Sequence, residues 1–134
     1  MTDVGGDGAT GVVSKVSPRS VSDTVARVVE LLGAKGLKLF AVVDHSGEAK
    51  AAGLELRETK LIIFGSPEAG TPVMVAAPLA ALDLPLKVLV WDQGGETKVS
   101  YTSPSALADR YRFSDALAGR LAGIDALTDA AVAR

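Results

Sequence analysis

TKLIIFGSPEAGTPVMVAAPLAALDLPLKVLVW, residues 59–91, is the stretch that decides the fold of this 134-residue chain. Two runs rich in branched apolar residues, 61–64 and 86–91, predict strands. Between Glu68 and Asp83 the connection has no charged side chain, although a connection normally crosses a solvated surface. We therefore expect this apolar connection to be buried and to supply core, a cavity wall or a subunit interface.

The sequence after this stretch predicts a hairpin followed by helices. Residues 92–96, DQGGE, supply glycines for a tight turn, so 97–102 is expected to pair antiparallel with 86–91. Ser103 and Pro104 are typical of a helix N-terminus and predict a helix over 105–111. A last helix is expected to begin after its cap, and its apolar face consists of positions at helical spacing. The cap is Ser114 and the face is Leu117, Leu121, Ile124 and Thr128.

The sequence before this stretch alternates strand and helix patterns. Residues 11–17 predict a strand that Pro18 ends, and Ser20 caps a helix. The apolar face of that helix is Val21, Val25, Val28 and Leu32. Residues 37–43, LKLFAVV, are nearly continuously apolar and predict a strand that is covered on both faces. Together with a short helix over 46–53 and the hairpin, these elements predict an α+β fold with a largely antiparallel sheet.

Length and composition favour one globular domain over 11–134, preceded by a flexible tail over 1–10. Hydrophobic residues make up 48% of the chain and charged residues 22%, with a net charge of −2. The interspersed charges offer no basic face, which argues against nucleic acid as a partner. There is no cysteine and no apolar run long enough for a membrane span, so we expect a cytoplasmic protein. A G-x-G-x-x-G pattern at 6–11 precedes the first strand, whereas a dinucleotide fingerprint follows one; we therefore expect no cofactor.

Several motifs together resemble one bacterial family, and the resemblance extends from Val12 to the last helix. They are FAVVDH at 40–45, GLEL at 53–56, IFGSP at 63–67, GTPVM at 70–74, LDLPLKV at 82–88, and Tyr101 with Pro104, Leu107 and Arg110. This combination resembles the family called domain of unknown function 302. The resemblance implies a compact β-α-β(4)-α domain with a TBP-like arrangement, short extra helices and frequent homodimers, and it implies no established activity. The chain departs from the family pattern at Ser66, where Asn is usual, and at 57–59.

His45 is the only histidine and is therefore the first candidate for acid–base chemistry. Its neighbour Asp44 points to the opposite face of an extended strand, so the two side chains do not form a dyad by themselves. We interpret Asp44 as a helix cap and His45 as an anchor or a cavity wall. General acid–base work by His45 and metal ligation with Glu48 are the alternatives, and the metal site lacks an identified third ligand. We predict no metal.

The remaining candidates are apolar or anion-binding side chains. Met74 is interpreted first as core and second as a pocket residue. Tyr101 and Arg110 are candidates for holding an anion, and an ordinary exposed helix face is the alternative for Arg110. The predicted ligand-binding set is Asp44, His45, Phe64, Gly65, Met74, Tyr101 and Arg110.

Three functions from different classes follow. We favour a non-catalytic binding module, acting as a homodimer, whose cavity holds a small apolar or weakly anionic molecule. A small enzyme that uses His45 as acid or base is the second hypothesis. A structural or interaction protein, in which residues 70–82 form a dimer face, is the third.

Overall fold

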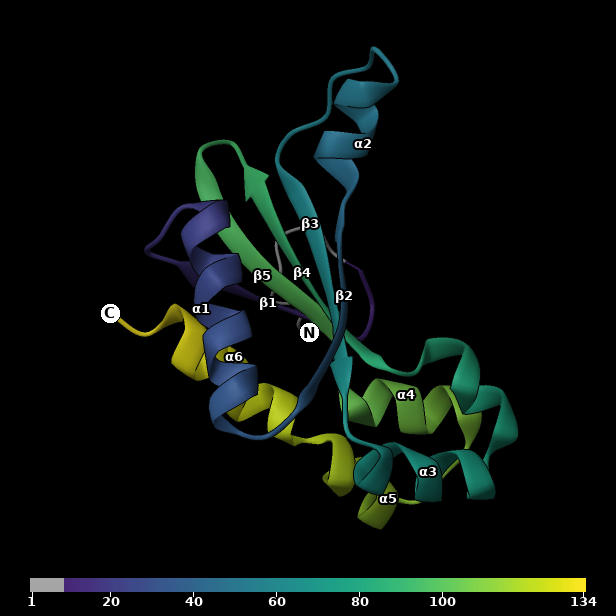
Figure 1. Ribbon diagram of the computed structural model, residues 1–134. Helices are drawn as coiled ribbons and strands as arrows, with labels where there is room; N and C mark the ends of the chain where they lie inside the picture. The colour runs from purple at the N-terminus through teal and green to yellow at the C-terminus, as the bar shows by residue number, and fades with distance from the viewer. Residues whose placement is uncertain (1–8) are drawn as a thin grey trace.

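The five strands that the described residues form make up a single antiparallel sheet in the order β1-β5-β4-β3-β2 (Figure 1). The structure is a computed structural model and describes residues 9–134. The strands are β1 (Val12–Ser17), β2 (Lys38–Asp44), β3 (Thr59–Gly65), β4 (Leu86–Gln93) and β5 (Glu96–Thr102). The predicted hairpin is confirmed, because β4 and β5 pair with Gln93 opposite Glu96. Gly94 and Gly95 in its turn have φ of 61° and 91°, the region that glycine adopts without steric cost.

The helices form three groups, one on a face of the sheet and one at each of its ends. They are α1 (Val21–Ala34), α2 (His45–Ala51), α3 (Pro67–Ala76), the 3₁₀ helix η1 (Pro78–Asp83), α4 (Pro104–Tyr111), α5 (Asp115–Leu121) and α6 (Gly123–Val132). Helices α1 and α6 pack against the sheet, whereas α3, η1, α4 and α5 gather at one of its ends (Figure 1). Helix α2 projects from the opposite end. The predicted α+β class is confirmed, and the TBP-like description stays a prediction.

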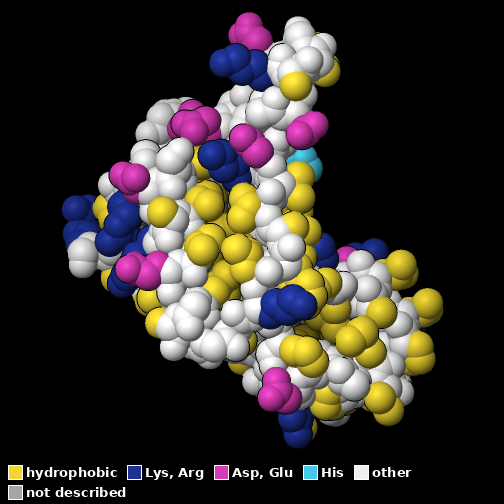
Figure 2. Space-filling model, in the orientation of Figure 1, with side chains coloured by type: hydrophobic (Ala, Val, Ile, Leu, Met, Phe, Trp, Pro, Cys, Tyr) yellow, Lys and Arg dark blue, Asp and Glu magenta, His cyan; other side chains and the backbone are white. Residues whose placement is uncertain are grey.

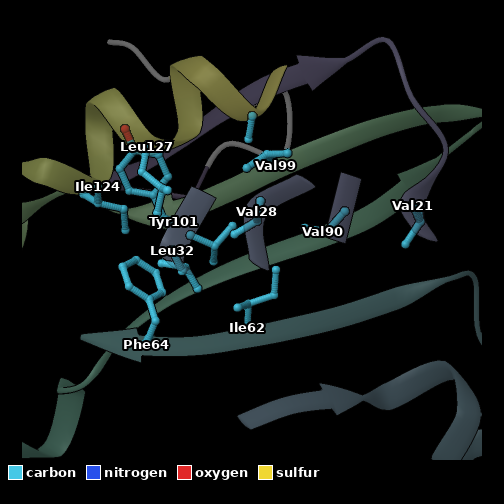
Figure 3. Packing of buried hydrophobic residues seen from close by; sticks show 12 residues of the cluster. Val21, Val28, Leu32, Ile62, Phe64, Val90, Val99, Tyr101, Ile124 and Leu127 are labelled. Atoms are coloured by element: carbon cyan, nitrogen blue, oxygen red, sulfur yellow. The ribbon is translucent and has the colours of Figure 1, made fainter. Parts of the chain in front are cut away.

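The main core lies between the sheet and the helices α1 and α6, and we call it the sheet cluster (Figure 3). Alternate residues of the strands point into it, because strand side chains alternate between the two faces. Val88, Val90 and Val99 contribute from β4 and β5 with no exposed surface. Val28, Leu32 and Leu127 face them from the two helices.

A second and smaller core lies between α3, η1, α4 and α5, and we call it the helical cluster. Its buried members are Val73, Ala77, Ala80, Leu107, Ala108, Phe113, Ala118 and Leu121. Four of these eight side chains are alanine, so the helices meet through little side-chain volume. The predicted caps hold both clusters in place, since the hydroxyls of Ser20, Ser103 and Ser114 each accept a hydrogen bond from a backbone N–H in the first turn of their helix.

The prediction that β2 is covered on both faces is wrong, because residues 38–42 of this edge strand are all exposed. Phe40 is 47% exposed and Val42 is 40% exposed. A continuous apolar run signals an environment that excludes water, but it does not say where in the sheet the strand lies. The run therefore marks an apolar sheet edge in this chain.

The apolar connection folds as α3 and η1, and its predicted burial is confirmed on one side only. Val73, Ala77 and Ala80 are buried, whereas Val75, Leu79 and Leu82 are between 70% and 77% exposed. Figure 2 shows apolar side chains gathered over this end of the molecule. The burial prediction is wrong for the outer side, because the helices present a second apolar face for which the described residues provide no cover.

The helix predicted after Ser114 is in fact two helices. Helix α5 ends at Leu121 and α6 begins at Gly123, with Ala122 between them. The apolar spacing of Leu117, Leu121 and Ile124 continues across the break, which is why the sequence pattern predicts a single helix. The predicted tail lies outside the described residues, apart from residues 9 and 10. No helix formed by residues 9–134 has both the length and the apolar character needed to cross a membrane.

Candidate ligand pocket

An apolar pocket of about 310 Å³ lies where the sheet cluster meets the helical cluster. Four segments that are distant in sequence line it, and they are the start of β2, the end of β3 with α3, the 84–86 hinge, and the junction of α5 and α6. The lining residues are Leu37, Phe40, Phe64, Gly65, Ser66, Pro67, Ala69, Gly70, Thr71, Met74, Leu84, Pro85, Leu86, Arg120, Leu121, Gly123 and Ile124. A volume near 300 Å³ is at the lower end of the range for small-molecule sites.

One wall of the pocket comes from the turn between β3 and α3. Phe64 and Gly65 end the strand, Ser66 is the N-cap, and Pro67 occupies the first helical turn, where its missing N–H costs nothing. The Ser66 side chain caps no backbone N–H; its hydroxyl donates to the Glu68 carboxylate over 3.0 Å. Gly70 follows one turn later, and a β-carbon there would lie 3.7 Å from the Met74 methyl group.

The rest of the wall comes from the hinge, which lies beside the end of β3, and from the helix junction. The Leu84–Pro85 peptide bond is cis and joins η1 to β4. Ile124, Leu121 and Phe64 form the inner part of the pocket. Their exposed fractions are 2%, 4% and 2%. The floor of the pocket is therefore apolar and belongs to both clusters.

Arg120 is the one charged side chain among the described lining residues. It is exposed and lies in the last turn of α5. Ser66 and Thr71 add hydroxyl groups. The pocket thus combines an apolar floor with a cation at its exposed side, and such an arrangement suits a ligand that is mainly apolar.

Three of the predicted site residues meet in this pocket, and they are Phe64, Gly65 and Met74. Asp44 and His45 do not line it. They lie at the other end of β2 from Phe40, roughly 15 Å away at the rise of an extended strand. The structure therefore does not bring His45 to the cavity that Met74 lines.

Asp44 has the predicted role of a helix cap. Its Oδ1 accepts hydrogen bonds from the Gly47 N–H at 2.9 Å and from the Ser46 hydroxyl at 2.8 Å. The Gly47 bond, followed by the Ser46 bond, holds the pKa of the Asp44 carboxyl below its usual value. His45 is the first residue of α2. Among residues 9–134, no group of three histidine, aspartate or glutamate side chains is arranged to hold a metal ion.

Tyr101 belongs to the sheet cluster and is 4% exposed. Its hydroxyl donates to the Asp125 carboxylate, and the Lys15 ammonium lies 5.2 Å from the centre of its ring. Burial, together with the bond to Asp125, raises the pKa of Tyr101. Burial opposes the charge on Lys15, but its bonds to Asp129 and Tyr101 outweigh this effect and raise the pKa of Lys15. Tyr101 is thus engaged within the core.

Arg110 lies on α4 and interacts within the helical end of the molecule. Its guanidinium is 3.5 Å from the Asp83 carboxylate and 5.5 Å from the centre of the Tyr111 ring. The Tyr111 hydroxyl also donates to Asp83, and this bond raises the pKa of Tyr111. The structure therefore does not bring Arg110 and Tyr101 together to hold an anion.

Sequence reasoning missed the contribution of the α5–α6 junction. Arg120 and Ile124 reach the pocket from the two sides of this junction, and their spacing of four residues is that of neighbours on one helix face. Gly119 precedes Arg120 and Gly123 precedes Ile124, and these glycines are the available signal for the break, since glycine weakens a helix interior.

Fold and pocket together define a small α+β domain that holds an apolar pocket beside an open antiparallel sheet. Residues 13–131 match the family described as "Domain of unknown function DUF302", and the chain belongs to this family. A solved structure titled "Crystal structure of uncharacterized conserved protein DUF302 from Bacillus stearothermophilus" has the same fold. It matches with a TM-score of 0.77 at 20% identity, covering 92% of this chain and 97% of that chain.

Curated relatives carry a different name. The chain is 40% identical over 103 residues to "Fluoride-specific ion channel FluC 1" of Brucella suis biovar 1 (strain 1330). The aligned residues cover 76% of this chain and 41% of that protein. The protein of the same name from Brucella abortus biovar 1 (strain 9-941) is also 40% identical over 103 residues, which cover 38% of it. The chain thus matches about two fifths of the length of these relatives.

Proposed function

We propose that this protein is a non-catalytic binding module whose pocket holds a small apolar or weakly anionic molecule. The observation that carries the proposal is the pocket of about 310 Å³, whose floor consists of Phe64, Leu121 and Ile124. Removal of apolar surface from water stabilises a complex by roughly 25 cal/mol per Å², so such a floor favours an apolar ligand.

Catalysis and transport are not part of this proposal. Acid–base catalysis needs a group that titrates near the working pH within hydrogen-bonding reach of the substrate. The described lining residues include no histidine or carboxylate, and His45 lies at the far end of β2. The name "Fluoride-specific ion channel" belongs to proteins of which this chain matches only about two fifths of the length.

The pocket hypothesis is tested by filling the pocket from within. In the variant Gly70→Leu the new side chain starts 3.7 Å from the Met74 methyl group and extends into the pocket. The neutral fluorophore N-phenyl-1-naphthylamine is the probe, because its emission rises in an apolar site. We expect saturable binding to the natural protein and at least about tenfold weaker binding to the variant, a loss of about 1.4 kcal/mol.

Gly119→Leu is the matched control. Gly119 is also a helical glycine, but nothing lies within 4 Å of a β-carbon built there, and it does not line the pocket. This control is expected to bind the probe like the natural protein. Equal loss in both variants, or no saturable binding to the natural protein, would refute the pocket hypothesis.

We further propose that the module is a homodimer, paired through the free edge of β2. This edge strand carries Leu39, Phe40 and Val42 with 39% to 47% exposure. An edge strand presents unpaired backbone N–H and C=O groups to any strand that aligns with it. A second copy that pairs antiparallel about Ala41 extends the sheet from five strands to ten.

The sequence of β2 is self-complementary in this register. With Ala41 at the two-fold axis, Lys38 lies opposite Asp44 of the second copy, and Leu39 lies opposite Val43. Opposite charges directly across an antiparallel pair stabilise it, and like charges destabilise it. A symmetric dimer contains this pair twice.

Light scattering of the natural protein tests the dimer, with an expected mass of twice 13.7 kDa. The variant Lys38→Glu places like charges opposite each other at both ends of the ladder, and we expect it to shift the mass towards the monomer. Leu79→Lys is the control, because it puts a charge on the exposed face of η1. If only the control becomes monomeric, the interface lies on α3 and η1. A monomeric natural protein would refute the dimer. The β-bulge between Leu39 and Ala41 would then be the feature that keeps this edge from pairing with a second copy.

A further inference from the structure

We propose that the pocket selects an amphipathic anion, with a carboxylate at Arg120 and a hydrocarbon tail on the apolar floor. This inference rests on the proposed binding function and adds the chemical class of the ligand. It follows from the way in which charge and burial change across the lining residues, because the exposed end carries a cation and the inner end is apolar.

Arg120 supplies the site for the head group. It is the one charged group among the described lining residues, and it takes part in no ion pair with the residues that the structure describes. A guanidinium presents parallel N–H donors that match the two oxygens of a carboxylate. By contrast, Arg110 is 3.5 Å from Asp83 and Arg27 is 2.7 Å from Glu30. Arg120 is therefore an arginine at the pocket whose donors are free for a ligand.

The other charges around the pocket fit this polarity. The Lys38 ammonium lies 5.0 Å from the centre of the Phe40 ring, which itself lines the pocket, so a second cation is near the β2 side. Three carboxylates are adjacent in sequence to lining residues, and each accepts a hydrogen bond from a hydroxyl of the chain: Glu68 from Ser66, Asp83 from Tyr111, and Asp125 from Tyr101. These carboxylates are thus engaged within the protein, whereas Arg120 takes part in no ion pair with the residues that the structure describes.

The inner part of the pocket supplies the site for the tail. Phe64, Leu121 and Ile124 are at most 4% exposed, whereas Arg120 is exposed. A ligand therefore meets charge at the outside and hydrocarbon inside. Each methylene group that enters this floor strengthens binding roughly fourfold. A charged head has no partner at the floor and would lose its hydration there, so the orientation is fixed.

Displacement of N-phenyl-1-naphthylamine by decanoate, decan-1-ol and decylammonium tests the inference at about pH 8, where the carboxylate is ionised. The three probes share one tail and differ in the head group. We expect decanoate to bind at least about tenfold more tightly than decan-1-ol, with decylammonium weakest, since a hydrogen bond between charged groups is stronger than one to a neutral hydroxyl.

The variant Arg120→Gln assigns the preference to the guanidinium. It is expected to bring decanoate to within about threefold of decan-1-ol, while the affinity for decan-1-ol stays unchanged. Arg120→Lys is expected to keep part of the preference, because an ammonium attracts the carboxylate without the paired geometry. Arg112→Gln removes the same charge from an exposed position outside the pocket and is expected to preserve the full preference.

The outcomes separate this inference from the binding function on which it rests. Equal affinities of the natural protein for decanoate and decan-1-ol would overturn the inference and leave apolar binding intact. Equal losses of both ligands in Arg120→Gln would also overturn it, since they show that Arg120 only maintains the pocket. If neither decan-1-ol nor the fluorophore binds, the binding function itself fails.

Discussion

The two apolar clusters of this chain are built from different materials. The sheet cluster packs large side chains such as Phe64, Leu32 and Ile62 between a sheet and two helices, and each of these is at most 2% exposed. The helical cluster packs four alanines among its eight buried residues. On the outer side of this cluster, η1 presents Leu79 and Leu82 to solvent, 70% and 75% exposed.

This difference divides stability from binding. Close-packed large side chains stabilise a fold because each buries much apolar surface. The four alanines of the helical cluster bury less apolar surface, and the pocket lies where the two clusters join. We infer that the sheet cluster holds the fold together while the helical cluster shapes the pocket. Four predictions test this comparison.

The largest effect is expected from the same substitution made in each cluster. Leu127 in the sheet cluster has no exposed surface, and Leu107 in the helical cluster is 5% exposed. We expect Leu127→Ala to lower the free energy of unfolding by about 4 kcal/mol and Leu107→Ala by about 2 kcal/mol, because the cost depends on how well the site relaxes around the cavity. Urea titrations of both variants measure the difference.

An exposed leucine provides the reference for this pair. Leu82→Ala is expected to change the free energy of unfolding by less than about 0.5 kcal/mol, because Leu82 is 75% exposed. Equal losses for Leu127→Ala and Leu107→Ala would show that both clusters are packed equally well and would remove the comparison.

Local parts of the fold are predictable from the sequence for a physical reason. The hairpin at Gly94 and Gly95 and the caps at Ser20 and Ser114 depend on residues that are neighbours in the chain. The edge position of β2 depends instead on the order of five strands, which no local pattern contains. Its apolar run therefore predicts burial without saying what covers it.

The pocket was predictable only where one motif supplies it. Phe64, Gly65 and Met74 lie in the stretch that decides the fold, and the structure places all three in the pocket. Arg120 reaches it from the last turn of α5, which is distant in sequence from this stretch, so no local motif indicates the contact. Tyr101 was predicted as a ligand contact because its type suits an anion, but its hydroxyl is engaged by Asp125.

The second prediction compares one tyrosine from each cluster. Tyr101→Phe removes the bond to Asp125 beside a buried ring, and we expect it to lower the free energy of unfolding by about 1 kcal/mol at neutral pH. Tyr111→Phe removes the bond to Asp83 at the outside of the helical end, and a smaller loss is expected. Chemical denaturation of both variants measures the two losses, and a larger loss for Tyr111→Phe would contradict the division.

The same pair predicts a dependence on alkaline pH. The pKa values of Tyr101 and Lys15 are both raised in the folded protein, so both groups hold their protons more firmly there than in the unfolded chain. Their stabilising contribution is complete below about pH 10 and is lost as the pH rises through the folded values. We expect stability to fall less steeply above about pH 10 in Tyr101→Phe than in the natural protein. An unchanged slope would show that Tyr101 does not contribute to it.

The third prediction asks whether the helical end unfolds together with the sheet. Arg112 ends α4 with φ of 60° and ψ of 46°, a left-handed conformation that costs most residues about 1–2 kcal/mol relative to glycine. Arg112→Gly is expected to raise the free energy of unfolding by about 0.5–1 kcal/mol if the two clusters form one cooperative unit. Arg112→Ala removes the same charge but keeps the β-carbon, and no such gain is expected. Thermal unfolding measures the gain in global stability. If only the amide exchange of α4 and α5 slows, the helical end unfolds separately from the sheet.

The smallest global effect is expected at α2, which belongs to neither cluster. Asp44 caps this helix by accepting hydrogen bonds from the Gly47 N–H and the Ser46 hydroxyl, and these bonds lower the pKa of its carboxyl. The stabilising contribution of the cap is therefore present above about pH 4 and is lost as the pH falls through the folded pKa. We expect Asp44→Ala to speed amide hydrogen exchange within α2 while thermal unfolding stays almost unchanged, because no residue of α2 is buried. Glu48→Ala removes a charge from the same helix without the cap and is expected to have little effect. A loss of global stability as large as that of Leu107→Ala would show that α2 is part of the structural core.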